Sequence, residues 1–293
     1  MLLLTAFIWG STFVFQQTGM DHVGPLTFNS GRTVLAALFA GGWWVVIQKA
    51  SDQSVLPAKG HGTITLIGGL ICGVCLGFGM GLQQIGLKYT TVGKTSFISA
   101  LYIIIVPLIR MATGRKYRKG IWLCVLMALI GLFLLTVSGD AIIRLGDVLV
   151  FVSAVIFSVH ILVINHFTKQ VPGILLSFLQ MIVAAVLSMI GVLIFREAPT
   201  IAGITHAGGA LLYAGILSGG VAFTLQIVAQ KRVDPVVASL IMCLESVFGA
   251  LSGWIVLHER LSVREWIGAI LMFAAIVLVQ WMTNDKTQPV VSG

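Results

Sequence analysis

Long apolar runs separated by short polar stretches extend along the whole of this sequence. Charged, Pro-bearing or Gly-bearing residues divide the chain into ten mainly hydrophobic segments. A run of ~18 apolar residues is long enough for a helix to cross the ~30 Å hydrocarbon core of a bilayer. The pattern therefore predicts ten transmembrane helices, at residues 2–19, 26–48, 63–86, 92–111, 120–138, 146–166, 173–195, 207–230, 236–256 and 264–283.

Composition supports an all-α integral membrane protein. The 293 residues are 58% hydrophobic and 10% charged, whereas soluble domains are about 25% charged. The net charge of +8 would suggest nucleic acid in a soluble chain, but here the Lys and Arg residues lie in short loops between apolar segments. We expect a lipid bilayer and no nucleic acid as partner. The first segment lacks a basic start and a cleavage site, so it predicts a span and not a cleavable signal.

The distribution of basic residues orients the predicted helices. Cytoplasmic loops carry an excess of Lys and Arg, and with the N-terminus inside, eleven of these residues fall on the inner side and six on the outer side. Both termini are therefore predicted to be cytoplasmic. The inner set is Lys49, Lys59, Arg110, Arg115, Lys116, Arg118, Lys119, Lys169, Lys231, Arg232 and Lys286, and the outer set is Lys88, Lys94, Arg144, Arg196, Arg260 and Arg264.

The two halves of the chain resemble each other. The stretch LQQIGLKYTTVGKTSFISALY is similar to LQIVAQKRVDPVVASLIMCLE. A shift of 143 residues pairs Gln83 with Gln226, Lys88 with Lys231, Ser96 with Ser239 and Tyr102 with Glu245. We predict a five-helix repeat over residues 1–139, a second one over 140–284, and a short cytoplasmic tail at 285–293.

An odd number of helices in each repeat places the second copy upside down relative to the first. Inverted repeats are typical of secondary transporters, in which two halves rock around a site near the membrane midplane. Two alternatives stay open, namely a duplication without alternating access and a channel.

Polar and aromatic side chains form stripes at helical spacing, which predicts a central cavity. Interhelical hydrogen bonding is the alternative for any single hydroxyl side chain. The stripes are Thr5, Trp9, Thr12 and Gln16; Thr95, Ser99 and Tyr102; and Ser153, Phe157 and His160. We add Phe78, Gln83, Gln226 and Glu245 to the predicted cavity wall.

Helix 63–86 carries glycines at every fourth residue, namely Gly69, Gly73, Gly77 and Gly81. Small residues at this spacing let two helices approach closely in a membrane. We predict a packing surface here, which also suits sliding during alternating access, and no ligand site.

Ionisable side chains within predicted spans are costly and are functional by default. Arg32 lies about two turns into its helix, and Glu245 is central in helix 236–256. Three interpretations of Glu245 stay open: an ion pair with Arg32, a proton carrier, and a hydrogen-bond partner of substrate. His160 is a further candidate proton carrier, or a hydrogen-bonded interior histidine.

Motifs for catalysis, metals and nucleotides are incomplete. Cys72 and Cys75 have no His or carboxylate near them in sequence, and the six histidines lack ligand spacing. VGKTS at residues 92–96 ends like a phosphate-binding loop, but Lys88 stands where that motif needs glycine. We therefore predict no enzyme, metal or cofactor, and no ATP-driven transport.

Several motifs resemble EamA-type members of the drug/metabolite transporter superfamily. They are IWGSTFV near the start, SFISALYIIIVPL in the fourth segment, and ASLIMCLESVFGALSGWIVLHERLS in the ninth. The resemblance covers essentially the whole chain. The sequence differs at Glu245-Ser246, where the family commonly has Glu-Pro, and at His258-Glu259-Arg260, where it has Gly-Glu-Arg. The first difference removes a cause of helix kinking.

The resemblance implies export of small metabolites, most often amino acids, across the bacterial cytoplasmic (inner) membrane by a multi-pass protein. We expect a monomer that binds a small-molecule substrate, with proton coupling open. The competing expectation is a proton-coupled multidrug exporter; a channel or membrane enzyme is the remote alternative.

Overall fold

The computed structural model describes residues 1–50, 62–136, 143–256, 261–284 and 291–292. The predicted loop residues Lys59, Arg260 and Lys286, the motif His258-Glu259-Arg260 and most of the predicted tail lie outside these ranges. The described chain is predominantly helical. Its elements are α1 (Leu2–Met20), α2 (Pro25–Ala50), α3 (Gly62–Lys88), α4 (Val92–Ser99), α5 (Tyr102–Ala112), β1 (Lys116–Tyr117), α6 (Lys119–Thr136), α7 (Leu145–Phe167), α8 (Gly173–Ile194), α9 (Ile201–His206), α10 (Gly208–Leu212), η1 (Tyr213–Ala222), α11 (Phe223–Gln230), α12 (Pro235–Met242), α13 (Glu245–Val256), α14 (Val263–Asn284) and β2 (Val291–Ser292).

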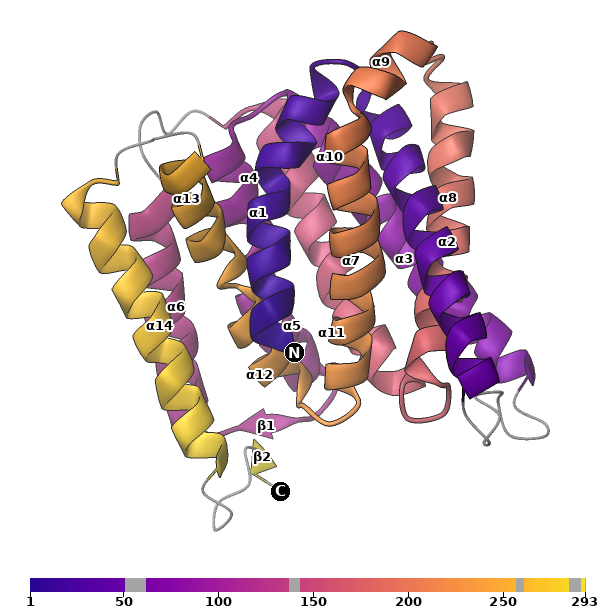
Figure 1. Cartoon of the computed structure of the whole chain (residues 1–293). Helices are drawn as coiled ribbons and strands as arrows, with labels where there is room; N and C mark the ends of the chain where they lie inside the picture. Colours follow the sequence, from indigo (N-terminus) through magenta and orange to yellow (C-terminus); the bar gives the residue numbers. More distant parts are fainter. Residues whose placement is uncertain (51–61, 137–142, 257–260, 285–290, 293) are drawn as a thin grey trace.

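Nine helical segments of the described chain are long and apolar enough to cross a membrane. Three of them combine shorter elements: α4 with α5, α10 through α11, and α12 with most of α13. Helix α1 has nineteen residues but is not among the nine, because Gln16 and Gln17 lower its mean hydropathy. The count of ten spans therefore stays a prediction. Helix α1 begins, and α14 ends, at the same end of the bundle (Figure 1).

Polar caps and prolines set several helix starts. Thr91 accepts a hydrogen bond from the Lys94 backbone N–H at the start of α4. Asp234 does the same for Val236 at the start of α12, where Pro235 occupies the first turn. These are favoured residues at helix N-termini, since the first N–H groups have no partner within the helix.

The helices pack along one common direction (Figure 1). Helices α6 and α14 form a pair at one edge, and α2, α3 and α8 pack against one another at the opposite edge. Helix α1 lies between them and contacts α13 and η1. The large side chains that remain exposed, such as Leu38, Leu66 and Leu70, have the character expected for a lipid-facing surface.

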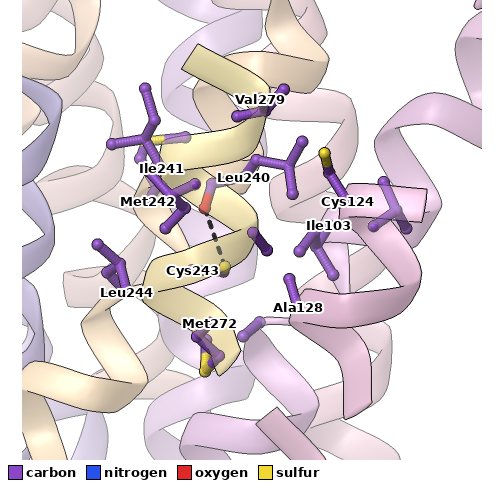
Figure 2. Packing of buried hydrophobic residues seen from close by; sticks show 14 of the residues in the cluster. Ile103, Cys124, Ala128, Leu240, Ile241, Met242, Cys243, Leu244, Met272 and Val279 are labelled. Carbon is purple, nitrogen blue, oxygen red and sulfur yellow. Dashed lines mark hydrogen bonds between the residues drawn. The ribbon is translucent and has the colours of Figure 1, made fainter. Parts of the chain in front are cut away.

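The main apolar cluster joins α5, α6, α12 and α14. Ile103, Cys124 and Ala128 face Leu240 and Met272 (Figure 2), and Met242 belongs to the same cluster. Cys243 lies in the same cluster, and its thiol donates to the Leu240 carbonyl oxygen at 2.9 Å. All four cysteines are free thiols. Close packing of this kind holds α12 against the α6–α14 pair.

Two short strands add a feature that the all-α prediction did not include. Strand β1 pairs with β2 in antiparallel register, with Lys116 opposite Ser292 and Tyr117 opposite Val291. The pairing joins the α5–α6 connection to the C-terminal segment near the end where α1 begins (Figure 1).

Candidate functional site

A cavity lies in the middle of the bundle. Its wall comes from α1, α2, α3, α4, α5, α7, η1, α11, α12 and α13, so both halves of the chain contribute to it. The lining residues are Trp9, Thr12, Phe13, Gln16, Arg32, Met80, Gln83, Ser99, Tyr102, Phe157, His160, Ile161, Ser218, Phe223, Gln226, Met242 and Glu245.

Two of the helices at the cavity are broken at corresponding places. The first break separates α4 from α5 at residues 100–101, and the second separates α12 from α13 at residues 243–244. The 143-residue shift found in the sequence carries one break onto the other. At each break a backbone N–H (Leu101 and Leu244) bonds a carbonyl three residues earlier, at 3.2 and 3.3 Å. These tight 3₁₀-type turns interrupt the α-helical ladder.

The break in α12–α13 needs no proline. Ser246 occupies the position at which EamA-type sequences commonly have proline. This difference removes one cause of a bend in the helix. The helix is interrupted nevertheless, directly before Glu245. The missing proline had left the bending of this helix in doubt, and the structure shows that the helix is interrupted there without it.

The two broken helices meet through polar side chains. The Tyr102 hydroxyl donates to Glu245 Oε1 at 3.0 Å, and both residues are the first of their half-helices. The hydroxyls of Ser96 and Ser246 are 2.8 Å apart. Glu245 is 5% exposed and Tyr102 is 4% exposed, so this junction is buried between the halves.

Arg32 and Glu245 line the same cavity but form no ion pair. Among the described residues the one salt bridge within 4.0 Å joins Lys94 to Asp147, near the starts of α4 and α7. The Arg32 Nε group instead donates to Asn29 Oδ1 at 2.8 Å. The structure therefore does not contain the Arg32–Glu245 pair that was one of the three interpretations of Glu245.

His160 is also buried in the cavity wall. Its Nε2 lies 3.0 Å from Gln180 Oε1 on α8, and its ring contacts Phe223 edge-on at 6.3 Å between centroids. This environment matches the hydrogen-bonded interior histidine that we considered beside the proton-carrying role.

Amide and indole groups around the cavity are only partly satisfied. The Gln83 side-chain NH₂ donates to the Ser99 hydroxyl at 2.9 Å. By contrast, Trp9 Nε1, Gln16 Oε1 and Gln226 Oε1 are buried without a hydrogen-bond partner among the residues that the structure describes. Buried polar groups are almost always paired, with protein or with an ordered molecule, so these atoms indicate a polar occupant of the cavity.

Aromatic rings form the apolar part of the wall. The rings of Trp9 and Phe223 are 4.7 Å apart, at an interplanar angle of 53°. Phe157 packs close to α3, where a Cβ on Gly79 would lie 2.8 Å from the Phe157 ring. A side chain at position 79 would therefore clash with the Phe157 ring, and glycine leaves room for it.

Six lining residues were missed in the sequence: Phe13, Met80, Ile161, Ser218, Phe223 and Met242. Phe223 lies one helical turn before Gln226, so the helical spacing carried a signal for it. Ser218 lies in η1, a π-helix. Such wider turns change which residues face inward and are frequent at functional sites, and helical periodicity does not reveal them.

Phe78 is the clear error among the predicted cavity residues. Its side chain is 54% exposed, so it points away from the interior. Three hydroxyl residues of the predicted stripes also lie outside the lining. Thr5 donates to the Ala222 carbonyl oxygen and Ser153 to that of Gly79, as expected for interhelical bonds, while Thr95 is buried.

The glycine ladder of α3 lies mainly against α8. A Cβ on Gly69 would meet the Leu179 side chain at 2.5 Å, and one on Gly73 would lie 2.9 Å from a backbone oxygen of α8. A Cβ on Gly77 would be 3.2 Å from a backbone carbon of the same helix. Gly81 has no such close neighbour. Sliding along this surface stays a prediction.

Comparison with known proteins gives the family. The model of the EamA-like transporter family matches residues 1–137 and 144–281, which together cover most of the chain. The chain belongs to the EamA-like transporter family. The match accords with the resemblance found in the sequence, and this family is one of membrane transporters rather than enzymes.

Relatives of similar length support the assignment to transporters. An "Uncharacterized transporter" of Archaeoglobus fulgidus is 28% identical over 279 residues, which cover 95% of this chain and 84% of the relative. The "Uncharacterized inner membrane transporter YedA" of Escherichia coli (strain K12) is 24% identical over 281 residues, covering 93% and 87%. This EamA-like chain is a multi-pass membrane transporter.

A solved crystal structure has the same fold. It superposes with a TM-score of 0.77 at 18% sequence identity and covers 96% of each chain. At this identity the likeness describes the fold alone.

Proposed function

We propose that this EamA-like protein is a secondary transporter that exports small metabolites, in the first place amino acids, across the cytoplasmic membrane. Transport would proceed by alternating access through the central cavity between two inverted five-helix repeats, with both termini in the cytoplasm. The observation that carries the proposal is the meeting of two broken helices at Tyr102 and Glu245, beside the cavity. Interrupted helices near the midplane form the substrate site in many transporters.

The arrangement of the halves supports the repeats. The family model matches the two halves separately, and the helix breaks fall at positions related by the sequence shift. Helix pairs α2–α8 and α6–α14 join corresponding helices of the two halves. Two similar halves around one cavity give two similar conformations, each open to one side.

The cavity wall suits a small molecule with both polar and apolar parts. Small-molecule sites are mostly apolar, with a few polar groups that fix the orientation of the ligand. Unpartnered amide oxygens and the ionisable side chains of Arg32, His160 and Glu245 lie beside an aromatic surface. An amino acid has this combination of polar and apolar groups.

Counterflow in proteoliposomes tests the proposal. Purified protein is reconstituted into liposomes loaded with an unlabelled amino acid, and uptake of the same labelled amino acid is followed for a panel of amino acids. A carrier gives saturable uptake that the internal amino acid stimulates. The absence of such flux for every amino acid would refute this substrate class, and currents from single proteins would indicate a channel.

A matched pair of carboxylate substitutions makes the test specific to the site. Glu245→Gln removes the acid at the helix junction, whereas Glu265→Gln alters a residue that bonds Ser262 at the start of α14. We expect counterflow to be lost in the first variant and kept in the second. Equal counterflow activity of the two variants would show that transport does not require the Glu245 carboxylate.

A proton-coupled multidrug exporter is the second candidate, because a buried carboxylate next to aromatic rings suits hydrophobic cations. Drug-tolerance assays in cells that overexpress the protein distinguish the two functions. Increased tolerance to cationic drugs that Glu245→Gln abolishes, without amino-acid counterflow, would favour this candidate.

A further inference from the structure

Arg32 is a buried cation without a buried anion beside it. Its side chain is 3% exposed and lines the cavity, and within the described part of the chain no carboxylate oxygen lies within 4.0 Å of it. A buried charge without a partner of opposite sign is costly. Its presence in a cavity wall indicates that an anionic group enters the cavity.

A chain of hydrogen bonds holds Arg32 in place and leaves most of its donors unused. Nε donates to Asn29 Oδ1 at 2.8 Å, and Asn29 Nδ2 donates to Ser188 Oγ at 2.8 Å. The Ser188 hydroxyl donates in turn to the Ala184 carbonyl oxygen. A guanidinium has five N–H donors, and its two terminal nitrogens have no bond to another described residue. Those nitrogens have the geometry that binds a carboxylate through two parallel hydrogen bonds.

The backbone around Arg32 is held as firmly as its side chain. Helix η1 packs directly on α2, and a Cβ on Gly215 would lie 3.0 Å from the Arg32 carbonyl oxygen. The contact between the two helices is therefore close at this residue. A fixed backbone and a bonded Nε reduce the conformational entropy that ligand binding would cost.

A complementary group lies elsewhere in the same wall. Glu245 accepts one hydrogen bond from Tyr102 and forms no ion pair with the cations that the structure describes. The unpartnered Oε1 atoms of Gln16 and Gln226 are further acceptors in this wall. Three acceptors in one cavity match the three N–H donors of a primary ammonium group.

We propose that Arg32 binds the carboxylate of the substrate, and that Glu245 with the two glutamines binds its ammonium group. The two charges would then select zwitterions over cations and anions of the same shape, while Trp9, Phe157 and Phe223 contact an apolar side chain. Asn29 and Ser188 are positioning residues for Arg32. This inference rests on the proposed transport of amino acids and specifies which ends of the substrate the site recognises.

Three probes with one side chain test the charge selection. Leucine is a zwitterion, leucinamide is a cation, and N-acetylleucine is an anion. Dissociation constants for the purified full-length protein are measured by calorimetry for the wild type, Arg32→Gln, Arg32→Lys, Glu245→Gln and Ser188→Ala. The wild type should bind leucine more tightly than either analogue.

Each variant should lose discrimination against one analogue. Arg32→Gln should weaken leucine binding by about 10- to 100-fold, the size expected for a charged hydrogen-bonded contact, and leave leucinamide binding unchanged. Glu245→Gln should weaken leucine binding and spare N-acetylleucine. Arg32→Lys keeps the charge but loses the paired donors, so it should weaken leucine binding less than Arg32→Gln does. Ser188→Ala should weaken leucine binding by a smaller factor still.

The outcomes separate this inference from the proposed function. The inference would be overturned if the wild type showed leucine counterflow and Arg32→Gln kept the wild-type ratio of leucine affinity to leucinamide affinity. That result would leave the proposed transport function standing. No wild-type binding or flux of leucine, or of any other amino acid, would overturn both. Retained leucinamide binding shows that the Arg32→Gln variant is folded. If that variant does not fold, the ratio of leucine affinity to leucinamide affinity is measured for Arg32→Lys and Ser188→Ala instead.

Discussion

The two broken helices have the same backbone plan but different surroundings. Their breaks correspond residue by residue, yet 72% of the residues of Pro235–Ser252 are buried, against 44% of the most apolar 18-residue stretch of Val92–Ala112. All eight residues of α12 are buried, and six of them belong to the apolar cluster shown in part in Figure 2. In α4 only Thr95, Ser96 and Ser99 are buried.

This difference indicates what an inverted pair can do. In one conformation of the transporter, the equivalent half-helices α4 and α12 have different surroundings. In the other conformation, each would have the surroundings that its counterpart has in the first. In this structure α12 is therefore the more firmly packed half-helix and α4 the less firmly packed one. Their chemistry differs too, since the second half-helix begins with Tyr102 in one case and Glu245 in the other.

The largest expected effect concerns the close contact of α1 with α13. A Cβ on Gly10 would lie 2.7 Å from the Gly249 backbone nitrogen, so Gly10→Ala should destabilise the protein by about 1–3 kcal/mol through overpacking. Gly42→Ala is the matched control, because nothing lies within 4 Å of a Cβ there. Thermal unfolding in detergent measures both variants.

The corresponding positions in the other half sharpen this prediction. Aligning Trp9 with Phe157 places Gly10 opposite Ser158, and the 143-residue shift places Gly249 opposite Val106. The contact of α7 with α5 therefore does not depend on glycine there. Equal melting temperatures for Gly10→Ala and Gly42→Ala would show that α1 is not closely packed on α13.

A middle-sized effect is expected at the junction of the halves. Tyr102→Phe removes the one hydroxyl that donates to Glu245, which leaves the carboxyl group buried with less stabilisation. Hydrogen bonds to a charged group contribute about 1.5–3 kcal/mol, so the variant should lose stability by up to that amount. Ser96→Ala, which removes the neighbouring hydroxyl contact to Ser246, should cost less.

Denaturation in detergent compares these two variants. If Ser96→Ala destabilised the protein more than Tyr102→Phe, the hydroxyl pair and not the Tyr102–Glu245 bond would be the main polar link between the halves.

The smallest effects are expected at the two helix caps. Asp234 caps α12 with a 2.9 Å bond to the Val236 N–H, and Thr91 caps α4 with a 3.2 Å bond to the Lys94 N–H. Loss of a cap costs about 0.5–2 kcal/mol. Because the Asp234 bond is shorter and α12 is part of the core, Asp234→Ala should destabilise more than Thr91→Ala.

Tyr117 adds to this difference. Its hydroxyl lies 3.4 Å from Asp234 Oδ1, and burial raises the pKa of Tyr117 above its usual value despite the opposing effect of Arg110. The hydroxyl therefore stays protonated at neutral pH and can donate to Asp234. Melting temperatures of the two cap variants and of Tyr117→Phe rank these losses of stability. A larger fall in melting temperature for Thr91→Ala than for Asp234→Ala would contradict the proposal that α12 is more firmly packed than α4.

Much of the fold could be predicted from sequence because bilayer thickness fixes the length of apolar runs. The breaks could not, because no proline marks residues 100–101 or 243–244 and the interruption depends on how the two helices meet. Length alone predicted an uninterrupted helix over 236–256, whereas α12 and α13 turn at the cavity.

Residue types predicted polar members of the site better than apolar ones. Arg32, His160 and Glu245 are costly in lipid, so a place in the interior followed from physics. Phe78 could not be placed in that way, since a phenylalanine is equally favourable toward lipid and toward a cavity. Phe223 was missed because its residue type carries no such signal, and only its position one helical turn before Gln226 could have indicated that it faces the cavity.

Reciprocal accessibility of the two half-helices tests the central claim most directly. The 143-residue shift pairs Gly93 in α4 with Val236 in α12, which is fully buried. Each position is changed to cysteine in a variant whose four native cysteines are replaced, and labelling by a polar maleimide is timed in nanodiscs with and without a transported amino acid. The account predicts fast labelling at 93 and slow labelling at 236 without substrate, and a substrate-dependent shift of the two rates in opposite directions. Rates that stay constant, or that rise together, would contradict alternating access by these halves.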